Sequence, residues 1–328
     1  MQNILFIIDE LELKYFEFND LVTNHWLIKE FLDRGYKVCV STKNRLLIEN
    51  AKGTALYFDS FAKNGDIFYE KIEKKGLIND FDVVFFRPDP PVDVNYINAC
   101  YVFDFVDKER TLLINDPCAV RNFNEKLHLN YFPQYAPENI VTSSKEEIKS
   151  FVNKVQNAII KPLNRCFGSG VYFLHAGDPN INSIISSLTE DGKTAVMVQK
   201  YLDKAIHGDK RVLIFNDFVF DECVRKLPGK DDFKFNTHSD KFFERAELTP
   251  KEKEMALDVA SKLSKTGLYM VGLDVIDEKI IEINVTSPCY FIREINHLDQ
   301  TNFQNTLMSQ IINFINAKTA KLYAKTNS

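Results

Sequence analysis

The sequence predicts an α/β and α+β protein, in which a doubly wound N-terminal domain precedes a two-part fold built on antiparallel strands. Short apolar runs that alternate with helical stretches predict the first domain. Two helix-start signals and several β-prone runs predict the second part, which ends with an acidic hairpin at 271–288. We expect an N-terminal α/β domain over 1–118, a small α+β lid module over 119–200 and a C-terminal domain over 201–328.

The N-terminal domain is expected from its buried strands. Ile4–Ile8 is a run of five apolar residues, the pattern of a strand buried on both faces. A helix should run from about Asp20 to Asp33 and end at Gly35. Further strands are expected at Lys37–Val40, Phe81–Phe86 and Leu112–Ile114, after which Asn115-Asp-Pro117 forms a turn.

Beyond Pro117 the pattern changes. Ser144-Lys-Glu-Glu147 and Thr249-Pro-Lys-Glu252 have the spacing of capping boxes, which predicts a helix to about Val155 and another that ends at Gly267. A last helix is expected from about 302 to 317. Four runs predict strands of one mixed, mainly antiparallel sheet: Ala158–Ile160, Val171–Leu174, Ala195–Val198 and Arg211–Phe215.

Composition excludes several classes of function. A net charge of −5 over 328 residues gives no basic surface for nucleic acid. The six cysteines are widely spread and form no CxxC pair, which argues against a disulfide framework or a zinc site and indicates a reducing compartment. The first residues resemble neither a signal peptide nor a membrane span. We therefore expect a cytoplasmic protein with no nucleic-acid or membrane partner.

The acidic hairpin poses an electrostatic problem. If its turn centres near Glu278, Asp274 lies opposite Glu282, and Asn284 shares the face of Glu282. Two carboxylates ~4–5 Å apart repel by roughly 3–4 kcal/mol at an effective dielectric of ~20. Something positive should therefore lie between them, and an all-oxygen Asp, Glu and Asn set suits Mg²⁺. The alternative is an exposed edge whose acids are solvated.

Two lysines are candidates for phosphate binding. Lys161 ends an apolar strand and is followed by Gly168-Ser-Gly170, so that the ammonium group and loop N–H groups could face one anion. Lys126 opens the segment after the first domain. The alternative for each is an ordinary surface lysine, and neither lies in a Walker motif or beside a GxGxxG fingerprint.

Four further segments carry candidate residues. Gln199-Lys-Tyr-Leu202 follows an apolar strand and is either an adenine-facing hinge or part of an ordinary core strand. Asp209-Lys-Arg211 precedes another strand, and the alternative to a functional role for this segment is a solvated turn. Arg87 follows a predicted parallel strand at the edge where α/β folds bind ligands, and its planar guanidinium suits a carboxylate. Arg293, beyond the hairpin, is a second candidate of that kind.

Together these segments resemble bacterial glutathione synthetase, a family of the ATP-grasp superfamily, over nearly the whole chain. The resemblance implies a pre-ATP-grasp domain followed by a two-part ATP-grasp fold, and an ATP-dependent carboxylate–amine ligase. It rests on Arg87-Pro-Asp-Pro-Pro91, Asn124-Glu-Lys126-Leu, Ile160-Lys-Pro162, Gln199-Lys-Tyr-Leu202, Gly208-Asp-Lys-Arg-Val212, Val271-Gly-Leu-Asp274 and Glu282-Ile-Asn-Val-Thr-Ser-Pro288, the last followed by Ile292-Arg-Glu294.

The resemblance also implies roles for the candidate residues. The implied ATP ligands are Lys126, Lys161, Gly168, Gly170, Gln199, Lys200, Tyr201, Leu202 and, near the ribose, Asp209. The implied ligands of two Mg²⁺ ions, with Mn²⁺ as an alternative, are Asp274, Glu282 and Asn284. The implied substrate contacts are Arg87, Asn236, Val285, Thr286, Ser287 and Arg293. The implied catalytic groups are Lys161 and Arg211, the latter stabilising the transferred phosphoryl group.

Family members phosphorylate the terminal carboxylate of γ-glutamylcysteine with ATP, and glycine attacks the acyl phosphate to give glutathione, ADP and phosphate. The chain departs from this family at two places. The glycines of loop 163–170 lie toward its end, and the lid at 231–245 lacks the family's Gly-Gly-Arg-Gly turn and has Lys234 in place of an arginine.

Because such a lid excludes water and helps to hold the acceptor, two alternatives stay open. One is an ATP-grasp ligase that joins a different carboxylate and amine, and the other is an ATP-binding relative without turnover. A homo-oligomer is expected by family analogy alone.

Overall fold

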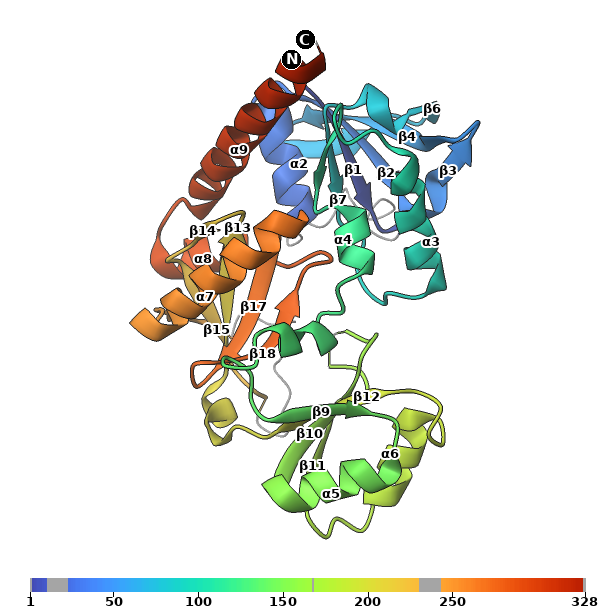
Figure 1. Ribbon diagram of the computed structural model, residues 1–328. Coiled ribbons are helices and arrows are strands. Elements are labelled where there is room, and N and C mark those ends of the chain that lie inside the picture. The colour runs from blue at the N-terminus through green and yellow to red at the C-terminus, as the bar shows by residue number, and fades with distance from the viewer. Residues whose placement is uncertain (1, 11–22, 167, 230–242, 327–328) are drawn as a thin grey trace.

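The computed structural model describes residues 2–10, 23–166, 168–229 and 243–326, whose strands form three sheets (Figure 1). The N-terminal domain contains β1 (Asn3–Ile8), α2 (Thr23–Asp33), β2 (Lys37–Thr42), β3 (Leu46–Glu49), β4 (Lys52–Lys63), β5 (Asp66–Tyr69), β6 (Lys74–Leu77), β7 (Val83–Phe86), α3 (Val94–Val102), β8 (Leu112–Ile114) and α4 (Pro117–Arg121). Its sheet has the order β3-β4-β2-β1-β7-β8, and β5 and β6 pair with β4. The strands β2, β1, β7 and β8 are parallel, as the apolar runs predict.

Both faces of this sheet are buried, which confirms the doubly wound arrangement. Along β1, Leu5 and Ile7 pack on the side of α3. The alternate residues Ile4, Phe6 and Ile8 pack on the side of α2 and of the C-terminal helix α9 (Phe303–Thr326). Figure 1 shows α2 and α9 on one side of β1 and β7, with α3 on the other.

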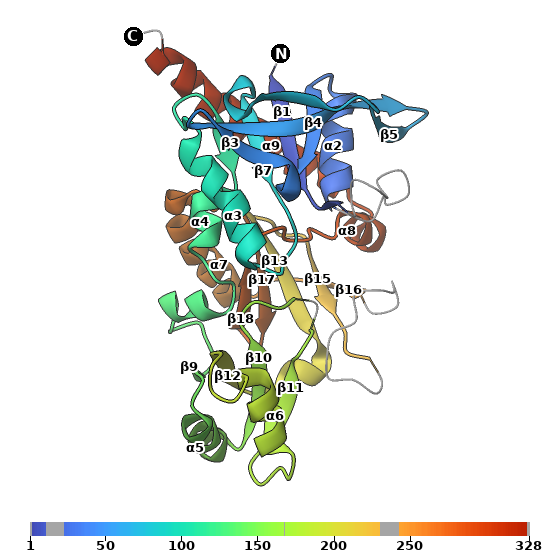
Figure 2. The ribbon, with the colours of Figure 1, turned by 90° about the vertical axis from the view of Figure 1, so that its right-hand side faces the viewer.

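Residues 46–77 form the antiparallel strands β3 to β6, which no apolar run predicts. In the twelve-residue strand β4 only Gly53–Ala55 is buried, because the strand leaves the core and extends with β5 beyond the edge of the sheet (Figure 2). A half-exposed strand needs no continuous apolar sequence. Runs of buried apolar residues therefore do not predict this part of the sheet.

A small antiparallel sheet follows, with the order β11-β10-β12-β9. Its elements are β9 (Asn139–Thr142), α5 (Lys145–Val155), β10 (Asn157–Pro162), β11 (Tyr172–His175), α6 (Ile181–Thr189) and β12 (Val196–Lys200). The Ser144 hydroxyl caps α5 by accepting a hydrogen bond from the Glu147 N–H, at 3.3 Å. Both helices pack on one face around Ile148, Ile160 and Val198, in a core separate from the rest of the chain.

The C-terminal sheet has the order β16-β15-β13-β17-β18, with β14 paired to β13. Its domain contains β13 (Asp209–Phe215), β14 (Phe218–Val219), β15 (Cys223–Lys226), β16 (Phe243–Ala246), α7 (Pro250–Leu263), β17 (Met270–Ile276), β18 (Lys279–Asn284), α8 (Ile292–Asp299) and α9. The expectation that Arg211–Phe215 joins the strands of residues 158–198 is wrong. A 3-10 turn at Asp203–His207 and Gly208 (φ 92°) carry the chain to the other sheet, where β13 pairs with β17.

The helices of this domain follow the sequence signals. Thr249 and Glu252 form both hydrogen bonds of the predicted capping box, with Pro250 in the first turn of α7. Helix α9 continues nine residues past the expected end at 317. Its C-terminal part still packs against the N-terminal domain, and Thr319 is buried there. None of the described helices is long and apolar enough to cross a membrane.

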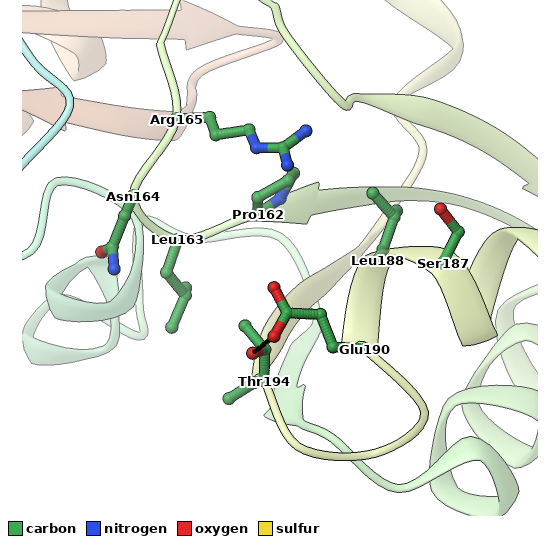
Figure 3. Close-up of a pocket in the computed structure, with 9 residues that line it drawn as sticks. Pro162, Leu163, Asn164, Arg165, Ser187, Leu188, Glu190 and Thr194 are labelled. Atoms are coloured by element: carbon green, nitrogen blue, oxygen red, sulfur yellow. Dashed lines mark hydrogen bonds between the residues drawn. The ribbon is translucent and has the colours of Figure 1, made fainter. Parts of the chain in front are cut away.

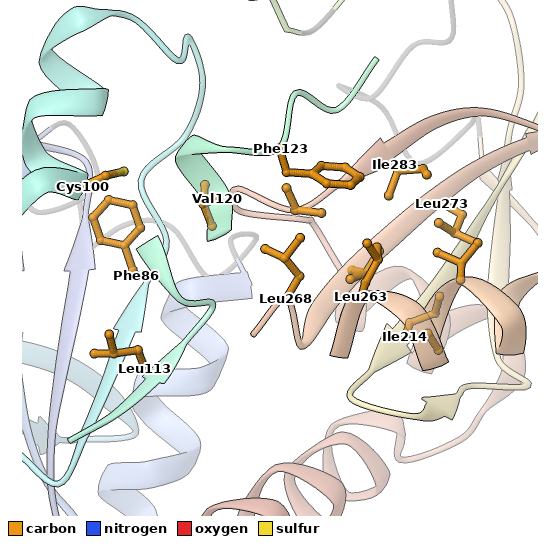
Figure 4. Close-up of a cluster of buried hydrophobic side chains, with 14 of the residues drawn as sticks. Phe86, Cys100, Leu113, Val120, Phe123, Ile214, Leu263, Leu268, Leu273 and Ile283 are labelled. Carbon is orange, nitrogen blue, oxygen red and sulfur yellow. The ribbon is translucent and has the colours of Figure 1, made fainter. Parts of the chain in front are cut away.

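One hydrophobic core joins the N-terminal and C-terminal domains. Figure 4 shows Phe86 and Leu113 of the first sheet continuing through Val120 and Phe123 to Leu268 near the start of β17. These two domains therefore share buried apolar surface, while the small sheet has its own core. The small module is attached through the chain at 122–138 and 201–208.

A buried amide reinforces this shared core. Asn115 Oδ1 accepts hydrogen bonds from the N–H groups of Tyr269 and Met270, both at 2.7 Å. Its Nδ2 donates to the carbonyls of Met270 (2.8 Å) and Val285 (2.7 Å). A single side chain of the N-terminal domain thus fixes both the start of β17 and the turn after β18.

Asn115→Ala should lower the free energy of unfolding by about 2–4 kcal/mol, because it leaves buried backbone groups without partners. Urea denaturation with linear extrapolation measures this change. Asn130→Ala is the matched control, since Asn130 donates one exposed hydrogen bond to Leu127 O within its own turn. It should change stability by less than about 0.5 kcal/mol. Equal stabilities of Asn115→Ala and the wild type would contradict the proposed clamp.

Candidate functional site

The acidic hairpin has the predicted pairing, but a β-bulge produces it. Asp277 and Glu278 have φ values of 50° and 57° and form a two-residue turn, flanked by the pairs Ile276–Lys279 and Val275–Ile280. A ladder without a bulge would then pair Asp274 with Ile281. The register shifts between Val275 and Asp274, so Asp274 pairs with Glu282 instead.

Asp274 is buried and saturated by donors from neighbouring strands. Arg211 lies directly across from it on β13 and donates through Nε (2.8 Å) and Nη2 (3.1 Å). Lys226 Nζ lies 3.0 Å from Oδ1, and Asn284 Nδ2 lies 3.1 Å from Oδ2. Burial alone would raise the pKa of Asp274, but the charges of Arg211 and Lys226 hold it well below the usual range.

Glu282 is compensated from the opposite side of the hairpin. Lys126 Nζ donates to Glu282 Oε1 at 2.8 Å, and both side chains are largely buried. The segment that carries Lys126 runs along β18, where the Ile283 N–H donates to Glu125 O and the Ile280 N–H to Tyr135 O. Each acid is thus paired with cations of the chain itself, Asp274 with Arg211 and Lys226 and Glu282 with Lys126.

Lys161 lies beside this cluster and is buried. Its Nζ donates to the carbonyl of Ile281, the residue at the bulge, at 2.8 Å and to Gln199 Oε1 at 3.1 Å. Burial lowers the pKa of Lys161 to about 8, although the charge of Glu282 opposes this shift. Lys161 and Lys126 therefore converge on β18 from the small module and from its connecting segment.

Arg211 reaches Asp274 by crossing Gly272. A Cβ atom at Gly272 would lie 3.1 Å from Arg211 Cδ and 3.3 Å from Pro288 Cβ, so a side chain there would crowd the guanidinium. Arg211 Nη1 continues to the carbonyl of Cys289, at 3.1 Å. The glycine of the Val-Gly-Leu-Asp motif thus makes room for the ion pair.

Sequence reasoning missed Lys226. It lies across from Asp209 in the pairing of β13 with β15 and binds Asp209 Oδ2 at 2.8 Å as well as Asp274. Asp209 is 1% exposed, and burial raises its pKa to about 7 even though Lys226 opposes the shift. No sequence signal pairs a lysine with acids 17 and 48 residues away, because only the sheet brings them together.

The predicted hinge leads from the small sheet toward the C-terminal sheet. Gln199 is 3% exposed, and its Nε2 has no hydrogen-bond partner among the described residues. The N–H groups of Lys200 and Tyr201 donate to Glu138 O and Asn157 O. Leu202 precedes the 3-10 turn, with its carbonyl accepting from Ala205 N–H at 2.9 Å.

The predicted phosphate loop folds back on itself. Gly168 and Gly170 have φ values of 68° and 74°, which suit glycine, and the N–H of Ser169 donates to Cys166 O. Arg165 O accepts a hydrogen bond from Lys126 Nζ at 2.8 Å. The loop is thereby tied to the lysine that binds Glu282.

The turn after β18 is fixed by a buried carboxylate that sequence reasoning also missed. Glu125 Oε1 accepts from the N–H groups of Val285 (2.7 Å) and Thr286 (3.0 Å) and from the Thr286 hydroxyl (3.0 Å). Ser287 donates to Asp89, at the end of the segment after β7. The predicted substrate turn thus lies between Glu125 and Asp89.

The two arginines proposed for substrate binding lie in different surroundings. Arg87 is 2% exposed and donates to Pro288 O at 3.0 Å, so it stabilises the turn that follows β18. Arg293, on α8, lines a hollow of about 170 Å³ with Phe243, Glu294 and His297. Asn236 lies outside the described residues.

Several solved structures share this fold. A D-cycloserine synthetase is 14% identical, with a TM-score of 0.63 and 97% of this chain and 99% of that chain covered. An ATP-grasp ligase of Chryseobacterium gregarium is 16% identical, with a TM-score of 0.62 and 97% of both chains covered. These likenesses show that the chain shares its fold with those two proteins, one of which is an ATP-grasp ligase.

The family follows from the sequence comparisons. Residues 3–121 match the prokaryotic glutathione synthetase N-terminal domain, and residues 125–300 match the prokaryotic glutathione synthetase ATP-grasp domain. A glutathione synthetase of Nostoc sp. is 40% identical over 73% of this chain and 72% of its own length. One from Vibrio cholerae serotype O1 is 34% identical over 85% and 88%. The chain belongs to the prokaryotic glutathione synthetase family and is an ATP-dependent carboxylate–amine ligase.

Lys226→Met should destabilise the fold in a pH-dependent way, because it leaves Asp209 buried without a cation. We expect a loss of about 3 kcal/mol in unfolding free energy near pH 8. The loss should shrink near pH 6, because the folded-state pKa of Asp209 is already raised to about 7 and will rise further without Lys226. The carboxyl group then takes up a proton and its burial costs less.

Urea denaturation at the two pH values tests this expectation. Lys251→Met is the control, since Lys251 is an exposed lysine paired with Glu278. It should change stability by less than about 0.5 kcal/mol at either pH. A deficit in Lys226→Met that does not depend on pH would argue against Asp209 as its cause.

Proposed function

We propose that this chain makes glutathione from γ-glutamylcysteine and glycine with ATP and Mg²⁺, and that the acidic cluster of β17 and β18 is its catalytic centre. The observation that carries the proposal is the row of charges across the sheet, in which Arg211, Asp274 and Glu282 are successive cross-strand partners. Phosphoryl transfer needs charge neutralisation and alignment more than a protein nucleophile. This row supplies fixed charges of both signs at one place.

The nucleotide would lie between the small sheet and the C-terminal sheet. Lys126 and Lys161 are the cations that would bind its phosphates, with Gly168 and Gly170 in the loop above them. Gln199 Nε2 and Asp209 Oδ1 are buried and have no hydrogen-bond partner within the described part of the chain. They fit a nucleotide, since a base and a ribose offer such partners. Lys200, Tyr201 and Leu202 would frame the adenine.

The metal ligands would be Asp274, Glu282 and Asn284, an oxygen set of the kind that Mg²⁺ prefers. Among the described residues no group of three or more His, Cys, Asp or Glu could hold a metal ion, so the Asn284 amide and the nucleotide phosphates would complete the coordination. Asn284 binds Asp274 through Nδ2, which leaves Oδ1 as a ligand. We assign two Mg²⁺ ions, with Mn²⁺ as an alternative.

The ion pairs of the cluster suggest how the site is loaded. Lys126 holds Glu282, and Lys226 shares Asp274 with Arg211. ATP phosphates compete for Lys126, and a lysine drawn toward them releases the Glu282 carboxylate. The same charges that stabilise the free protein would thus change partners when nucleotide and metal bind together.

The γ-glutamylcysteine substrate would bind at the turn formed by Val285, Thr286 and Ser287. Arg87 supports that turn through Pro288. We add Arg293 and Asn236 as further proposed contacts on the resemblance of their motifs alone. ATP bound with Mg²⁺ supplies the phosphoryl group that activates the carboxylate. Arg211 is held by Asp274 in a fixed orientation and would stabilise negative charge on the reacting oxygens.

Glu282→Gln should abolish turnover and weaken Mg²⁺-dependent ATP binding by at least about tenfold, because it removes one of the two carboxylate ligands. Calorimetry of ATP binding with and without Mg²⁺ measures the second effect, and circular dichroism checks the fold. Asp277→Asn is the matched control, since Asp277 lies in the turn of the same hairpin and, among the residues that the structure describes, pairs only with the exposed Lys204. Wild-type activity in Glu282→Gln would refute the metal assignment.

The substrates are tested by the release of phosphate. We expect release that requires γ-glutamylcysteine and glycine together, and that stays at background with either one alone. A screen of other amines in place of glycine tests the altered lid sequence at 231–245. Turnover with another amine and none with glycine would overturn the assignment of the acceptor.

A further inference from the structure

A second cavity lies on the small module, away from the acidic cluster. It has a volume of about 330 Å³ and opens between the loop that follows β10 and the end of α6 (Figure 3). The loop side contributes Pro162, Leu163, Asn164 and Arg165, and the helix side contributes Ser187, Leu188, Glu190, Thr194 and Ala195. Helix α6 packs on the helix-covered face of the small sheet, and none of the residues that line the cavity belongs to the acidic cluster.

Two opposite charges flank the cavity without pairing. Figure 3 shows the Arg165 guanidinium on one side and the Glu190 carboxylate on the other. Among the residues that the structure describes, the Arg165 side chain makes no hydrogen bond or ion pair. Glu190 accepts one hydrogen bond, from the Thr194 hydroxyl at 3.1 Å, through Oε2. Each charge therefore keeps capacity for a partner of opposite sign.

Gly170 leaves room for the Arg165 guanidinium beside the cavity. A Cβ atom at Gly170 would lie 3.1 Å from Arg165 Nη1 and 2.9 Å from Pro162 Cγ, so the glycine gives the guanidinium its place beside the cavity. Leu163 and Leu188 offer apolar surface between the charges. Ligand sites combine such apolar walls with a few convergent polar groups, in volumes of roughly 300–1,000 Å³.

Hydrogen bonds connect the wall of the cavity to Lys126, one of the two lysines that we propose to bind the nucleotide phosphates. Asn124 Nδ2 donates to Leu163 O and to Asn164 Oδ1, both at 3.1 Å. Two residues later, Lys126 Nζ donates to Arg165 O at 2.8 Å while it also binds Glu282. Three consecutive residues of the cavity wall are therefore bonded to the segment that positions Lys126.

We propose that this cavity binds a short zwitterionic peptide, with a carboxylate on Arg165 and an ammonium group on Glu190, and that its occupancy changes the affinity for ATP. A ligand with one charge of each sign satisfies both groups at once, which an inorganic anion or a lone cation does not. The cavity is too large for a single water-sized ion, since a water occupies about 30 Å³. The product of the proposed reaction is a peptide of this class, and that choice of probe rests on the proposed function.

Calorimetry with glutathione as the probe tests this site. The protein is first saturated with ADP, Mg²⁺ and γ-glutamylcysteine, which fill the catalytic site. We expect the wild type to bind glutathione at one further site. Glu190→Gln should weaken it at least about tenfold, the effect of losing one charge-assisted hydrogen bond. Ser187→Trp, at an exposed position of the wall, should abolish it by filling the cavity. An analogue of glutathione without its ammonium group should bind wild type and Glu190→Gln equally weakly.

Controls separate this site from the catalytic one. Glu147→Gln removes an exposed glutamate from α5 of the same module and should bind glutathione like the wild type. ATP affinity should respond more strongly to glutathione in the wild type and in Glu147→Gln than in Glu190→Gln or Ser187→Trp. These measurements need no turnover.

Three results would overturn the proposal. The first is no glutathione binding to the wild type with its catalytic site filled, and the second is equal binding by wild type and Ser187→Trp. The third is an Arg165→Met variant that binds ATP more weakly but keeps its glutathione site, because Arg165 would then belong to the nucleotide site.

Discussion

The opposition of two carboxylates on one hairpin is the constraint on which the rest of the site depends. Asp274 and Glu282 face each other in a largely buried place, where their repulsion must be balanced. Cations from three separate stretches of the chain balance it: Arg211, Lys226 and Lys126. The surrounding strands and connecting segments are thus held in register by charge as well as by apolar packing.

This balance explains how the chain keeps such a site folded. Removing one partner from a buried ion pair is strongly destabilising, whereas exchanging one partner for another of the same sign need not be. On the proposed assignment, a bound metal would replace a protein cation at a carboxylate, and a phosphate would replace a carboxylate at a lysine. The same charges would then be satisfied by different partners.

The division of the apolar core complements this arrangement. The N-terminal and C-terminal domains share one core and the Asn115 clamp, which fix the hairpin and the turn after it. The small module has a separate core and contacts the hairpin mainly through polar side chains such as Lys161. The hairpin and the turn after it therefore belong to the joined domains, whereas Lys161 and Gln199, which we propose to bind the nucleotide, belong to the attached module.

The sequence by itself determined the parallel strands, the helix starts and the acidic hairpin, because apolar runs, capping boxes and turn residues are local signals. It also marked Lys126, Lys161 and Arg211 through the resemblance of their motifs. Only the tertiary structure decided that a bulge sets Asp274 against Glu282, that Lys226 bridges Asp209 and Asp274, and that Glu125 holds the turn. Those contacts join residues far apart in the chain, and long-range pairing across a sheet leaves no trace in local sequence.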